Sequence, residues 1–448
     1  MSFPKYAKYK DSGVGWLGEV PEHWNIKRLG AIFRQADEEG EDDLAILSVS
    51  IHDGVSDKEL DEKEMDRKVT RSDDRSKYKK VQPGDLVYNM MRAWQGGFGS
   101  VAVLGMVSPA YVVARPISDF STTFVEHLLR TPQAIEQMRR YSQGVTDFRL
   151  RLYWDEFKAI NVVLPPRDEQ TLITEFLDRE TAKIDGLVGE QRRLIELLKE
   201  KRQAVISHAV TKGLNPHAPM KPSGIEWLGD VPEHWDVERL KYSITKLEQG
   251  WSPQCDNEPA GNNEWGVLKV GCGNRDVFDP TEQKALPLDI APLPEYEIKP
   301  GDILMSRGNT RDLVGMATIV KQVRPRLLLC DLLYRFHARH ERVESEYLVF
   351  SLRSANVRFQ IEREATGTSA SMKKIGQGTI REFVICLPPL DEQRAIIASI
   401  SAETAKLDTL TAEAQRAIDL LQERRTALIS AAVTGKIDVR GLVELEAA

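Results

Sequence analysis

Apolar residues recur at alternating spacings of four and three along a proline-free stretch from Asp168 to Thr211. The positions of this heptad seam are Ile173, Leu177, Glu180, Ile184, Leu187, Gln191, Leu194, Leu198, Lys201 and Val205. Such a pattern is typical of a long helix that packs against a second helix. A shift of 223 residues gives a second seam of the same register: Ile396, Ile400, Glu403, Leu407, Leu410, Ala414, Ala417, Leu421, Arg424 and Leu428.

The polar positions in the two seams predict how these helices pair. In one antiparallel register Glu180 lies opposite Arg424 and Glu403 lies opposite Lys201, with apolar layers between them. Complementary charges at seam positions fix the register of a coiled coil. Each helix would be roughly 66 Å long and the pair would hold two globular units at its ends. The alternative is that each helix packs separately on its own domain.

Distinctive motifs occur twice along the chain. "WLGEVPEHW" at Trp16–Trp24 returns as "WLGDVPEHW" at Trp227–Trp235, and each half then carries "PGD", "LPP-x-DEQ", "ETAK-x-D" and "AVT" in the same order. The stretches between these motifs diverge. The chain is therefore expected to be a tandem duplication with pseudo-two-fold symmetry, in which one frame carries two different variable segments.

Both variable segments mix short β-like runs with helical stretches. Strands are predicted for "LAILSVSI", "DLVYNMM", "GSVAVLGMV", "AYVVAR" and "INVVLP" in the first, and for "EWGVLKV", "DILMS", "MATIV" and "EFVICLP" in the second. One helix is predicted over 122–142 and another over 345–365. The expected fold class is α+β, with two α/β domains separated by two long helices that form an antiparallel coiled coil.

Composition narrows the class of protein. The 448-residue length predicts two or more domains, and 41% hydrophobic with 29% charged residues is typical of a soluble globular protein. Four cysteines without CxxC spacing favour a reducing, cytoplasmic location. We find no signal-peptide pattern and no apolar run of membrane-spanning length. A net charge of −7 argues against indiscriminate polyanion binding and leaves room for a local basic surface.

A polar loop after each "PGD" strand offers side chains suited to reading nucleic-acid bases. Arginine, glutamine and asparagine can form paired hydrogen bonds with base edges in the major groove. The candidates are Arg92, Trp94 and Gln95 in the first copy, and Arg307, Asn309 and Arg311 in the second. For any one of these residues, a solvated surface position remains the alternative.

A second candidate segment follows a glycine near the end of each variable segment. The first copy, "GVTDFRLRLYWDEFK", offers Arg149, Arg151 and Lys158, and the second, "GTSASMKK", offers Ser369, Ser371, Lys373 and Lys374. We expect groove or phosphate contacts here. Their equivalent placement in both copies favours a functional interpretation over isolated surface charges.

The sequence contains no recognisable catalytic constellation. "GVGWLG" at residues 13–18 matches a dinucleotide-binding fingerprint but follows no predicted strand. Asp289, Glu297 and Lys299 only faintly resemble a nuclease set, and "HARH" at 337–340 lacks partners for a metal site. The sequence therefore predicts a binding protein without an active site and without a bound metal.

Taken together, the motifs are similar to those of a known family. "SGVGWLGEVPEHW", "PGDLVYNMMRAWQGGFG", "VSPAYVVARP", "LPPRDEQ…ETAKID" and "LISAAVTGKIDVRG" resemble the specificity subunit of type I restriction–modification enzymes. The resemblance implies two target-recognition domains that each read one half of a split sequence in double-stranded DNA. It also implies docking of two methyltransferase subunits and two motor-nuclease (restriction) subunits. S-adenosylmethionine, ATP and magnesium would bind to those partners, and this subunit would bind no cofactor.

These expectations give a domain plan. The segments are an N-terminal anchor (1–24), target-recognition domain 1 (25–163), spacer helix 1 (164–213), a linker with the repeated anchor (214–235), target-recognition domain 2 (236–386), spacer helix 2 (387–436) and a C-terminal tail (437–448). The repeated tryptophan motif is interpreted as an anchor that packs each domain on the long helices. Two alternatives stay open: a two-headed coiled-coil scaffold that binds proteins, and an enzyme of unrecognised type.

Overall fold

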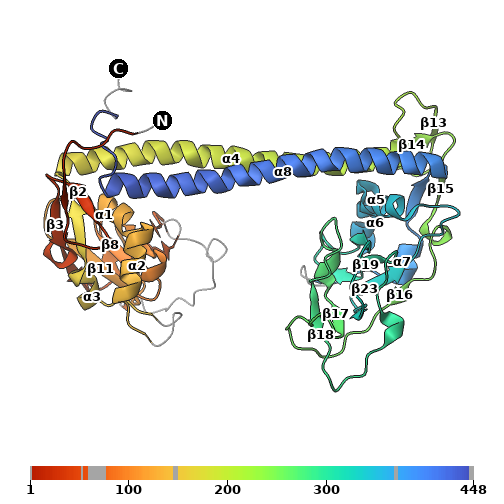
Figure 1. Cartoon of the computed structure of the whole chain (residues 1–448), viewed down its shortest axis with the longest axis horizontal. Helices are drawn as coiled ribbons and strands as arrows, with labels where there is room; N and C mark the ends of the chain where they lie inside the picture. Colours follow the sequence, from red (N-terminus) through yellow and green to blue (C-terminus); the bar gives the residue numbers. More distant parts are fainter. Residues whose placement is uncertain (1–2, 52–53, 59–76, 145–149, 368–371, 443–448) are drawn as a thin grey trace. The chain divides into compact units, whose positions relative to one another are not determined.

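A computed structural model describes residues 3–51, 54–58, 77–144, 150–367 and 372–442. The chain divides into two compact units. Unit 1 comprises residues 1–192 and 416–448, and unit 2 comprises residues 193–415. Two long helices, α4 (Arg167–Lys212) and α8 (Leu390–Val433), each contribute one part to either unit (Figure 1).

The long helices pair antiparallel, which confirms the predicted coiled coil. In unit 1 Arg425 Nε of α8 lies 2.9 Å from Asp185 Oδ1 of α4. In unit 2 Arg202 Nη1 of α4 lies 2.5 Å from Asp408 Oδ1 of α8. The two ion pairs are related by the 223-residue offset of the repeat, so each unit contains the same contact between its parts of the two helices.

Ion pairs within each helix occupy the predicted polar positions. Glu403 contacts Lys406 at 2.6 Å, and its pKa is lowered first by Lys406 and then by Lys201, its predicted partner. Glu180 contacts Arg179 and Lys183 of its own helix.

Leu187, expected in the seam, is 52% exposed, and the neighbouring Val188 is buried. Most apolar positions of the predicted seam are buried, Ile184 and Leu198 among them. The seven-residue period is therefore confirmed, and the prediction was wrong only in the order of the three- and four-residue steps after Ile184.

Unit 1 contains the first variable segment. Its strands are β1 (Tyr9–Asp11), β2 (Glu19–Pro21), β3 (Asn25–Arg28), β4 (Phe33–Ala36), β5 (Val49–Ser50), β6 (Gly54–Val55), β7 (Lys79–Val81), β8 (Leu86–Asn89), β9 (Phe98–Ser100), β10 (Gly105–Val107), β11 (Tyr111–Pro116) and β12 (Asn161–Leu164). Its shorter helices are α1 (Thr122–Leu129), α2 (Pro132–Tyr141) and α3 (Trp154–Ala159), with 3-10 turns η1 (Leu29–Ala31) and η3 (Ala93–Gln95). A four-stranded antiparallel sheet of order β4-β11-β8-β9 forms its centre.

Unit 2 contains the second variable segment. Its strands are β13 (Met220–Pro222), β14 (Asp230–Pro232), β15 (Asp236–Arg239), β16 (Glu248–Gln249), β17 (Gly266–Leu268), β18 (Gln283–Ala285), β19 (Ile303–Ser306), β20 (Gly308–Asn309), β21 (Ala317–Ile319), β22 (Leu327–Leu328), β23 (Leu333–Phe336), β24 (Lys373–Lys374) and β25 (Val384–Leu387). Its shorter helices are α5 (Ser345–Arg353), α6 (Ala355–Glu364) and α7 (Gln377–Arg381), with 3-10 turns η5 (Leu240–Tyr242), η6 (Val270–Gly273) and η7 (Pro294–Tyr296).

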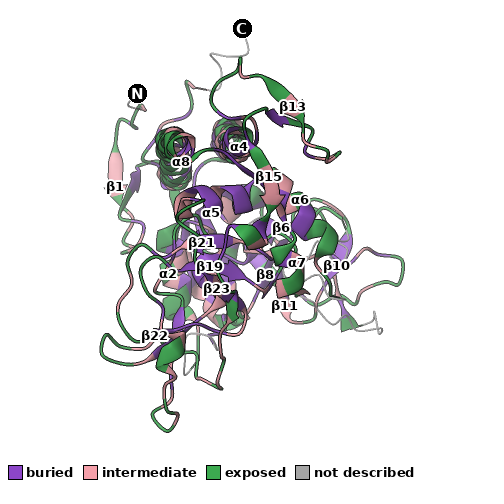
Figure 2. Ribbon diagram, turned by 90° about the vertical axis from the view of Figure 1, so that its right-hand side faces the viewer, coloured by how far each residue is buried: buried purple, intermediate pink, exposed green. Residues whose placement is uncertain are grey.

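The central sheet of unit 2 matches that of unit 1. Its order is β16-β23-β19-β21, again antiparallel throughout. The inner strand β19 and most of the edge strand β21 are coloured as buried in Figure 2, and α5 lies between this sheet and the long helices (Figure 1). In both units the first strand after the tryptophan motif pairs with the last strand before the long helix, β3 with β12 and β15 with β25.

Two of the predicted elements are divided in the structure. The helix expected over 122–142 ends at Leu129 and restarts at Pro132, where the Thr131 hydroxyl accepts a hydrogen bond from Ala134 N at 3.3 Å. Proline lacks an N–H and suits the first position of a new helix. Ser354 caps α6 at the equivalent place in unit 2, so the helix expected over 345–365 is divided as well. The strand expected for "GSVAVLGMV" splits into β9 and β10, because Val101 N bonds Asp85 O whereas Met106 N bonds Ala45 O.

A buried carboxylate at the start of α4 anchors the tryptophan motif of unit 1. Glu169, 5% exposed, accepts hydrogen bonds from Trp24 Nε1 at 3.0 Å and Tyr6 OH at 2.5 Å, and its other oxygen lies 2.7 Å from His23 Nε2. Burial and the hydrogen bond to Glu169 raise the pKa of Tyr6. Trp24 is fully buried and packs edge-on against Phe124 of α1. The motif thus joins the helix start to the domain core.

The same anchor recurs in unit 2. Trp235 Nε1 donates to Glu392 Oε2 at 3.1 Å, and His234 Nε2 lies 2.8 Å from the same oxygen. Trp235 is fully buried. The "HW" ending of the repeated motif and the glutamate of "DEQ" are therefore partners in both copies.

The glutamine of "DEQ" holds the first short helix of each unit. Gln170 Oε1 accepts from Ser121 N at 2.7 Å, and its amide donates to Pro165 O at 2.8 Å. In unit 2 Gln393 makes the equivalent bonds to Glu344 N at 2.9 Å and Pro388 O at 2.8 Å. The two N-cap positions thereby take the same place relative to the long helices, which explains why this motif is repeated.

One half-buried histidine distinguishes unit 1 from unit 2. His127 of α1 has a buried Nε2 that makes no hydrogen bond to any described residue. The pKa of His127 is lowered, mainly by burial. The carboxylates of Glu126 and Asp178 oppose this shift, and the cations Arg130 and Arg425 add to it. The folded chain therefore holds this ring in its neutral form.

We expect unit 1 to lose stability as the pH falls below about 6.5, the ordinary histidine pKa. Below that pH the unfolded chain binds a proton that the folded chain excludes, so protonation favours unfolding. His127→Phe, which copies Phe350 at the equivalent position of unit 2, should remove this part of the pH dependence. Thermal unfolding at pH 7 and pH 5 measures it. Equal pH dependence of the two proteins would contradict the assignment.

Candidate nucleic-acid interface

The first candidate loop of unit 1 follows β8. Arg92 is the N-cap of η3 and is half-buried, and its carbonyl accepts from Gly97 N at 3.0 Å. Trp94 is half-buried and its indole N–H donates to Met91 O at 3.0 Å. Gln95 is exposed and borders a cavity of about 320 Å³ that Arg425 also lines. The loop is thus ordered by its own backbone, with Gln95 the most accessible of the three predicted side chains.

The second candidate segment of unit 1 lies directly beside this loop. Arg151, which is exposed, exchanges two backbone hydrogen bonds with Gln143, both 2.9 Å long. Leu152 N donates to Met90 O at 2.9 Å, which joins the segment to the end of β8. Arg149 lies outside the described residues. The structure therefore brings Arg92 and Arg151 into neighbouring segments although they are far apart in sequence.

Unit 2 brings its two candidate segments together in the same way. β20 pairs with β24, so that Asn309 faces Lys373 and Gly308 faces Lys374. Ile375 N donates to Arg307 O at 2.9 Å, and Lys374 exchanges backbone hydrogen bonds with Thr366. Ser369 lies outside the described residues.

The links in the two units are equivalent by position. The bond from Leu152 N to Met90 O corresponds to the bond from Ile375 N to Arg307 O, and the Gln143–Arg151 pair corresponds to Thr366–Lys374. One backbone scaffold thus presents two adjacent segments in each unit, and the side chains on it differ.

The individual side chains of unit 2 differ in access. Arg311 is 71% exposed and lies 3.6 Å from Glu362. Arg307 is half-buried, and its guanidinium reaches Asp331 O at 3.5 Å. Asn309 is only 9% exposed, and its amide donates to Asn274 Oδ1 at 2.8 Å. Their roles in DNA binding stay predictions.

The aspartate of each "PGD" motif has a structural role that sequence reasoning did not assign. Asp85, fully buried, accepts from Gln82 N at 3.0 Å and from both Nε and Nη2 of Arg115 at 3.0 Å. The hydrogen bond to Asp85 raises the pKa of Arg115. In unit 2 the equivalent Asp302 accepts from Lys299 N at 2.9 Å and pairs with His337 at 2.7 Å.

Two features considered for catalysis or metal binding have structural partners. His337 of "HARH" is the partner of Asp302. Glu297, from the faint nuclease set, accepts a hydrogen bond from Arg326 N at 2.6 Å. Among the described residues, no group of three or more histidine, cysteine, aspartate or glutamate side chains is arranged to hold a metal ion. No helix within the described ranges has the length and apolar character needed to cross a membrane.

Comparison with known proteins gives consistent relatives, although no protein-family model matches the chain. The type I restriction enzyme EcoEI specificity subunit of Escherichia coli is 30% identical over 240 residues, which cover 53% of this chain and 40% of that relative. The EcoKI specificity subunit of the same species is 23% identical over 380 residues, which cover 82% and 77%. The chain thus spans less than half of the first relative and most of the second.

Solved structures agree in fold. A chain from a structure on complex assembly and conformational transition of the type I restriction–modification system has a TM-score of 0.67, with 17% identity, over 93% of this chain and 99% of that one. At this identity the similarity establishes the fold alone. By sequence over most of its length and by fold, the chain is therefore a relative of the specificity subunits of type I restriction enzymes.

Proposed function

We propose that the chain is the DNA-reading subunit of a type I restriction–modification complex and is itself not catalytic. Each unit reads one half of a split target in double-stranded DNA. The relatives are specificity subunits, and the alignment with the EcoKI subunit covers enough of the chain to include residues of both units. The proposal assigns the choice of sequence to this chain and the chemistry to its partners.

The main support for the proposal is that the two units share the same anchor contacts but differ in the side chains on their candidate segments. The anchors Trp24–Glu169 and Trp235–Glu392 are the same in both units, as are the backbone links between candidate segments. The side chains on those segments are not the same. Unit 1 presents Gln95 and Arg151 where unit 2 presents Arg311, Lys373 and Lys374. Two different surfaces on one scaffold should read two different half-sites, so the target should not be palindromic.

The residue types suit both parts of DNA recognition. Lysine and arginine neutralise phosphates and position the protein on the duplex, while arginine and glutamine can read base edges. In a chain of net charge −7, cations concentrated on these segments provide a local basic surface.

Footprinting of the chain with its methyltransferase partner tests this function. We expect two protected blocks of different sequence, separated by a stretch in which sequence does not affect binding. A single uninterrupted block, or binding that is equal on all sequences, would contradict the proposal. Retained partner binding without any DNA preference would instead favour a protein-binding scaffold.

Exposed leucines on the long helices are the proposed docking surface for methyltransferase subunits. Leu187 and Leu420 in unit 1 are 52% and 59% exposed, and Leu197 and Leu410 in unit 2 are 49% and 47% exposed. The residues of one pair correspond to those of the other by the repeat offset. Large apolar side chains at repeated, solvent-exposed helix positions are typical of an interaction surface. Two equivalent surfaces fit two copies of one partner, and restriction subunits would join that complex.

We expect the double variant Leu187→Glu, Leu420→Glu to bind one methyltransferase subunit fewer than the unchanged chain. Exposed positions contribute little to folding, so the free energy of unfolding should change by less than about 0.5 kcal/mol. Analytical ultracentrifugation with the partner measures the stoichiometry. The matched control replaces the exposed polar residues Glu190 and Glu423 by glutamine. Unchanged stoichiometry in the leucine variant would remove these residues from the interface.

The cofactors of the complex are proposed to bind the catalytic partner subunits. S-adenosylmethionine is proposed to bind the methyltransferase subunits, and ATP with magnesium the motor-nuclease subunits. This chain takes part in methylation and cleavage by choosing where its partners act.

A further inference from the structure

A third segment of unit 2 lies against the two candidate segments. The chain leaves η6 at Gly273, and Asn274 then accepts a hydrogen bond through Oδ1 from Asn309 Nδ2 at 2.8 Å. Asn309 itself is 9% exposed. The amide that the sequence singled out for base reading therefore holds the neighbouring segment Asn274–Asp276 in place.

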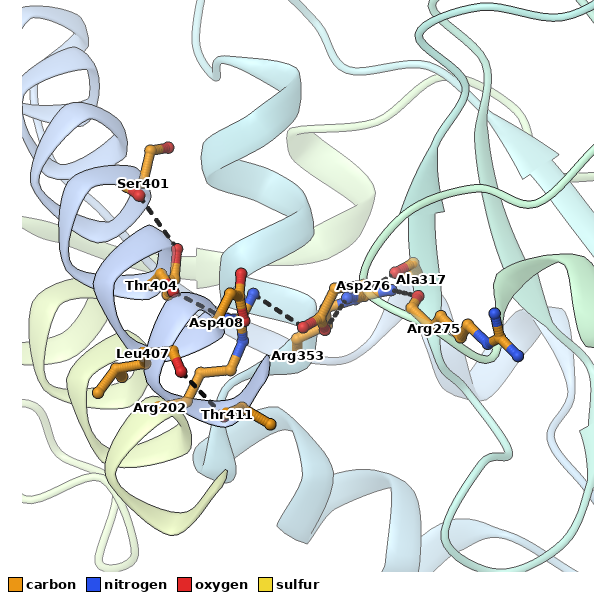
Figure 3. Close-up of polar contacts among 10 residues, drawn as sticks. All are labelled: Arg202, Arg275, Asp276, Ala317, Arg353, Ser401, Thr404, Leu407, Asp408 and Thr411. Carbon is orange, nitrogen blue, oxygen red and sulfur yellow. Dashed lines mark hydrogen bonds and ion pairs between the residues drawn. The ribbon is translucent and has the colours of Figure 1, made fainter. Parts of the chain in front are cut away.

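A buried arginine fixes the backbone and side chain of this segment. Arg353, the last residue of α5, donates to Arg275 O, Asp276 Oδ1 and Ala317 O, each at 2.5 Å (Figure 3). Its side chain is 7% exposed. Burial lowers the pKa of Arg353 and the Asp276 carboxylate opposes that shift. A buried cation with every terminal nitrogen bonded leaves its partners little freedom.

The second oxygen of Asp276 reaches the long helices. Asp276 Oδ2 lies 2.8 Å from Arg202 Nη2 of α4, and Arg202 Nη1 lies 2.5 Å from Asp408 Oδ1 of α8. Figure 3 shows this chain of contacts running from the helix pair through Asp276 to Arg353. Asp276 thus ties the segment both to the domain and to the helices of unit 2.

The contacts that fix Asn274 and Asp276 do not hold the side chain of Arg275, which lies between them in sequence. Arg275 is exposed, and in Figure 3 its guanidinium points away from Asp276 and Arg353. In the part of the chain that the structure describes, it has no carboxylate within ion-pair distance. The pKa of Asp279 is lowered mainly by hydrogen bonds from Thr281, and the charge of Arg275 makes a smaller contribution in the same direction. A fixed backbone carrying an unpaired cation is suited to an anionic ligand.

Unit 1 contains an arginine at the position equivalent to Arg353, and this arginine also holds a neighbouring segment. Arg130, at the position equivalent to Arg353, donates from Nη2 to Ile51 O at 2.9 Å. Ile51 lines the same cavity as Gln95 and Gly96 of the first candidate loop. In both units an arginine at the end of the first short helix therefore holds a third segment beside the "PGD" loop.

We propose that Arg275 contacts a DNA backbone phosphate and that Asp276 is its positioning residue. The inference deepens the proposed function and rests on it. A phosphate is favoured over a base because, among the residues that the structure describes, no second polar group holds the Arg275 guanidinium in the plane that a paired base contact requires. The third segment thereby extends the DNA surface of unit 2 beyond β20 and β24.

Salt-dependent DNA binding by the complex of the full chain with its methyltransferase partner tests the role of Arg275. We expect Arg275→Ala to weaken binding to the target duplex and to a random duplex alike, by about 3- to 10-fold, and to reduce the slope of log K against log salt by about 0.9. Arg239→Ala is the control, because this arginine of β15 is already ion-paired with Glu382. It should leave affinity and slope unchanged.

The substitution Asp276→Asn tests the positioning role of Asp276, because the two explanations predict opposite changes in DNA-binding affinity. Loss of a negative charge alone would tighten DNA binding. Loss of positioning weakens it, because asparagine can accept from only one of Arg202 and Arg353. We expect weaker binding, and in the Asp276→Asn background Arg275→Ala should have a much smaller effect than in the unchanged chain. Thermal unfolding checks that each variant is folded.

The outcomes separate the two levels of the proposal. If the unchanged complex shows no sequence preference, the proposed function fails. If that preference is present but Arg275→Ala matches the unchanged chain in affinity and slope, Arg275 contacts no phosphate. If Asp276→Asn binds more tightly, or if the two substitutions act additively, Asp276 is not its positioning residue.

Discussion

Trp24→Ala is expected to destabilise unit 1 by about 3–5 kcal/mol, the usual cost of removing a large buried aromatic side chain. Trp24 is fully buried between Tyr6 and Phe124, and its indole is one of three donors to Glu169. The substitution leaves a cavity and removes a hydrogen bond from a carboxylate that is itself buried. Of the single substitutions considered, this one should have the largest effect on folding.

Hydrogen exchange resolves where that stability is lost. Peptides from α1 and β11 should lose protection in Trp24→Ala, while peptides from α5 and β23 keep it. Trp235→Ala is the reciprocal variant and should reverse the pattern. Trp16→Ala, in the same motif but only half-buried, should have a smaller effect than Trp24→Ala. Equal loss in both units, or a loss of less than about 1 kcal/mol, would refute the anchor role.

Exchange of residues 25–163 for the corresponding segment of another specificity subunit is expected to change one half of the recognised sequence completely. The other half should be unchanged. The physical reason is that Trp24 and Glu169 lie outside the exchanged segment and Gln170 bonds only a backbone N–H within it, whereas the side chains of Arg92 and Arg151 are exchanged. The exchange therefore replaces a reading surface and keeps the scaffold.

Methylation by the exchanged chain with its methyltransferase partner measures the result. Exchange of residues 236–386 is the matched experiment and should alter only the other half. Simultaneous change of both halves by either exchange would show that the two surfaces do not read independently.

Repeated and periodic features of the sequence predicted the architecture well. The two heptad stretches do form antiparallel helices, and the variable segments are α+β. The prediction related each candidate segment only to its equivalent in the other copy. Within each unit, the structure places the first and second candidate segments side by side, through Leu152 N to Met90 O in unit 1 and Ile375 N to Arg307 O in unit 2.

Local sequence patterns could not predict contacts between residues that are far apart in the sequence. The repeated "DEQ" motif marked Glu169 and Gln170 but not their partners, and the structure shows that their side chains hold Trp24 and Ser121. Nothing near Asp276 in the sequence indicates that its partners are Arg202 and Arg353. Leu187 was misplaced because apolar residues at both 187 and 188 fit a heptad, and only Val188 is buried.

The helix breaks at Thr131 and Ser354 could have been found. "RTPQ" places a threonine before a proline, a recognised start signal for a new helix, and the equivalent serine follows by the repeat offset. Apolar periodicity continued across both breaks and outweighed that signal in the prediction.

Whether this chain selects a split target is tested by mapping methylated bases in cells that express it with its methyltransferase partner. We expect one motif with two different specific halves, separated by a gap of fixed length and unrestricted sequence. Methylation confined to a continuous or palindromic motif, or identical to that of cells expressing the partner alone, would contradict it.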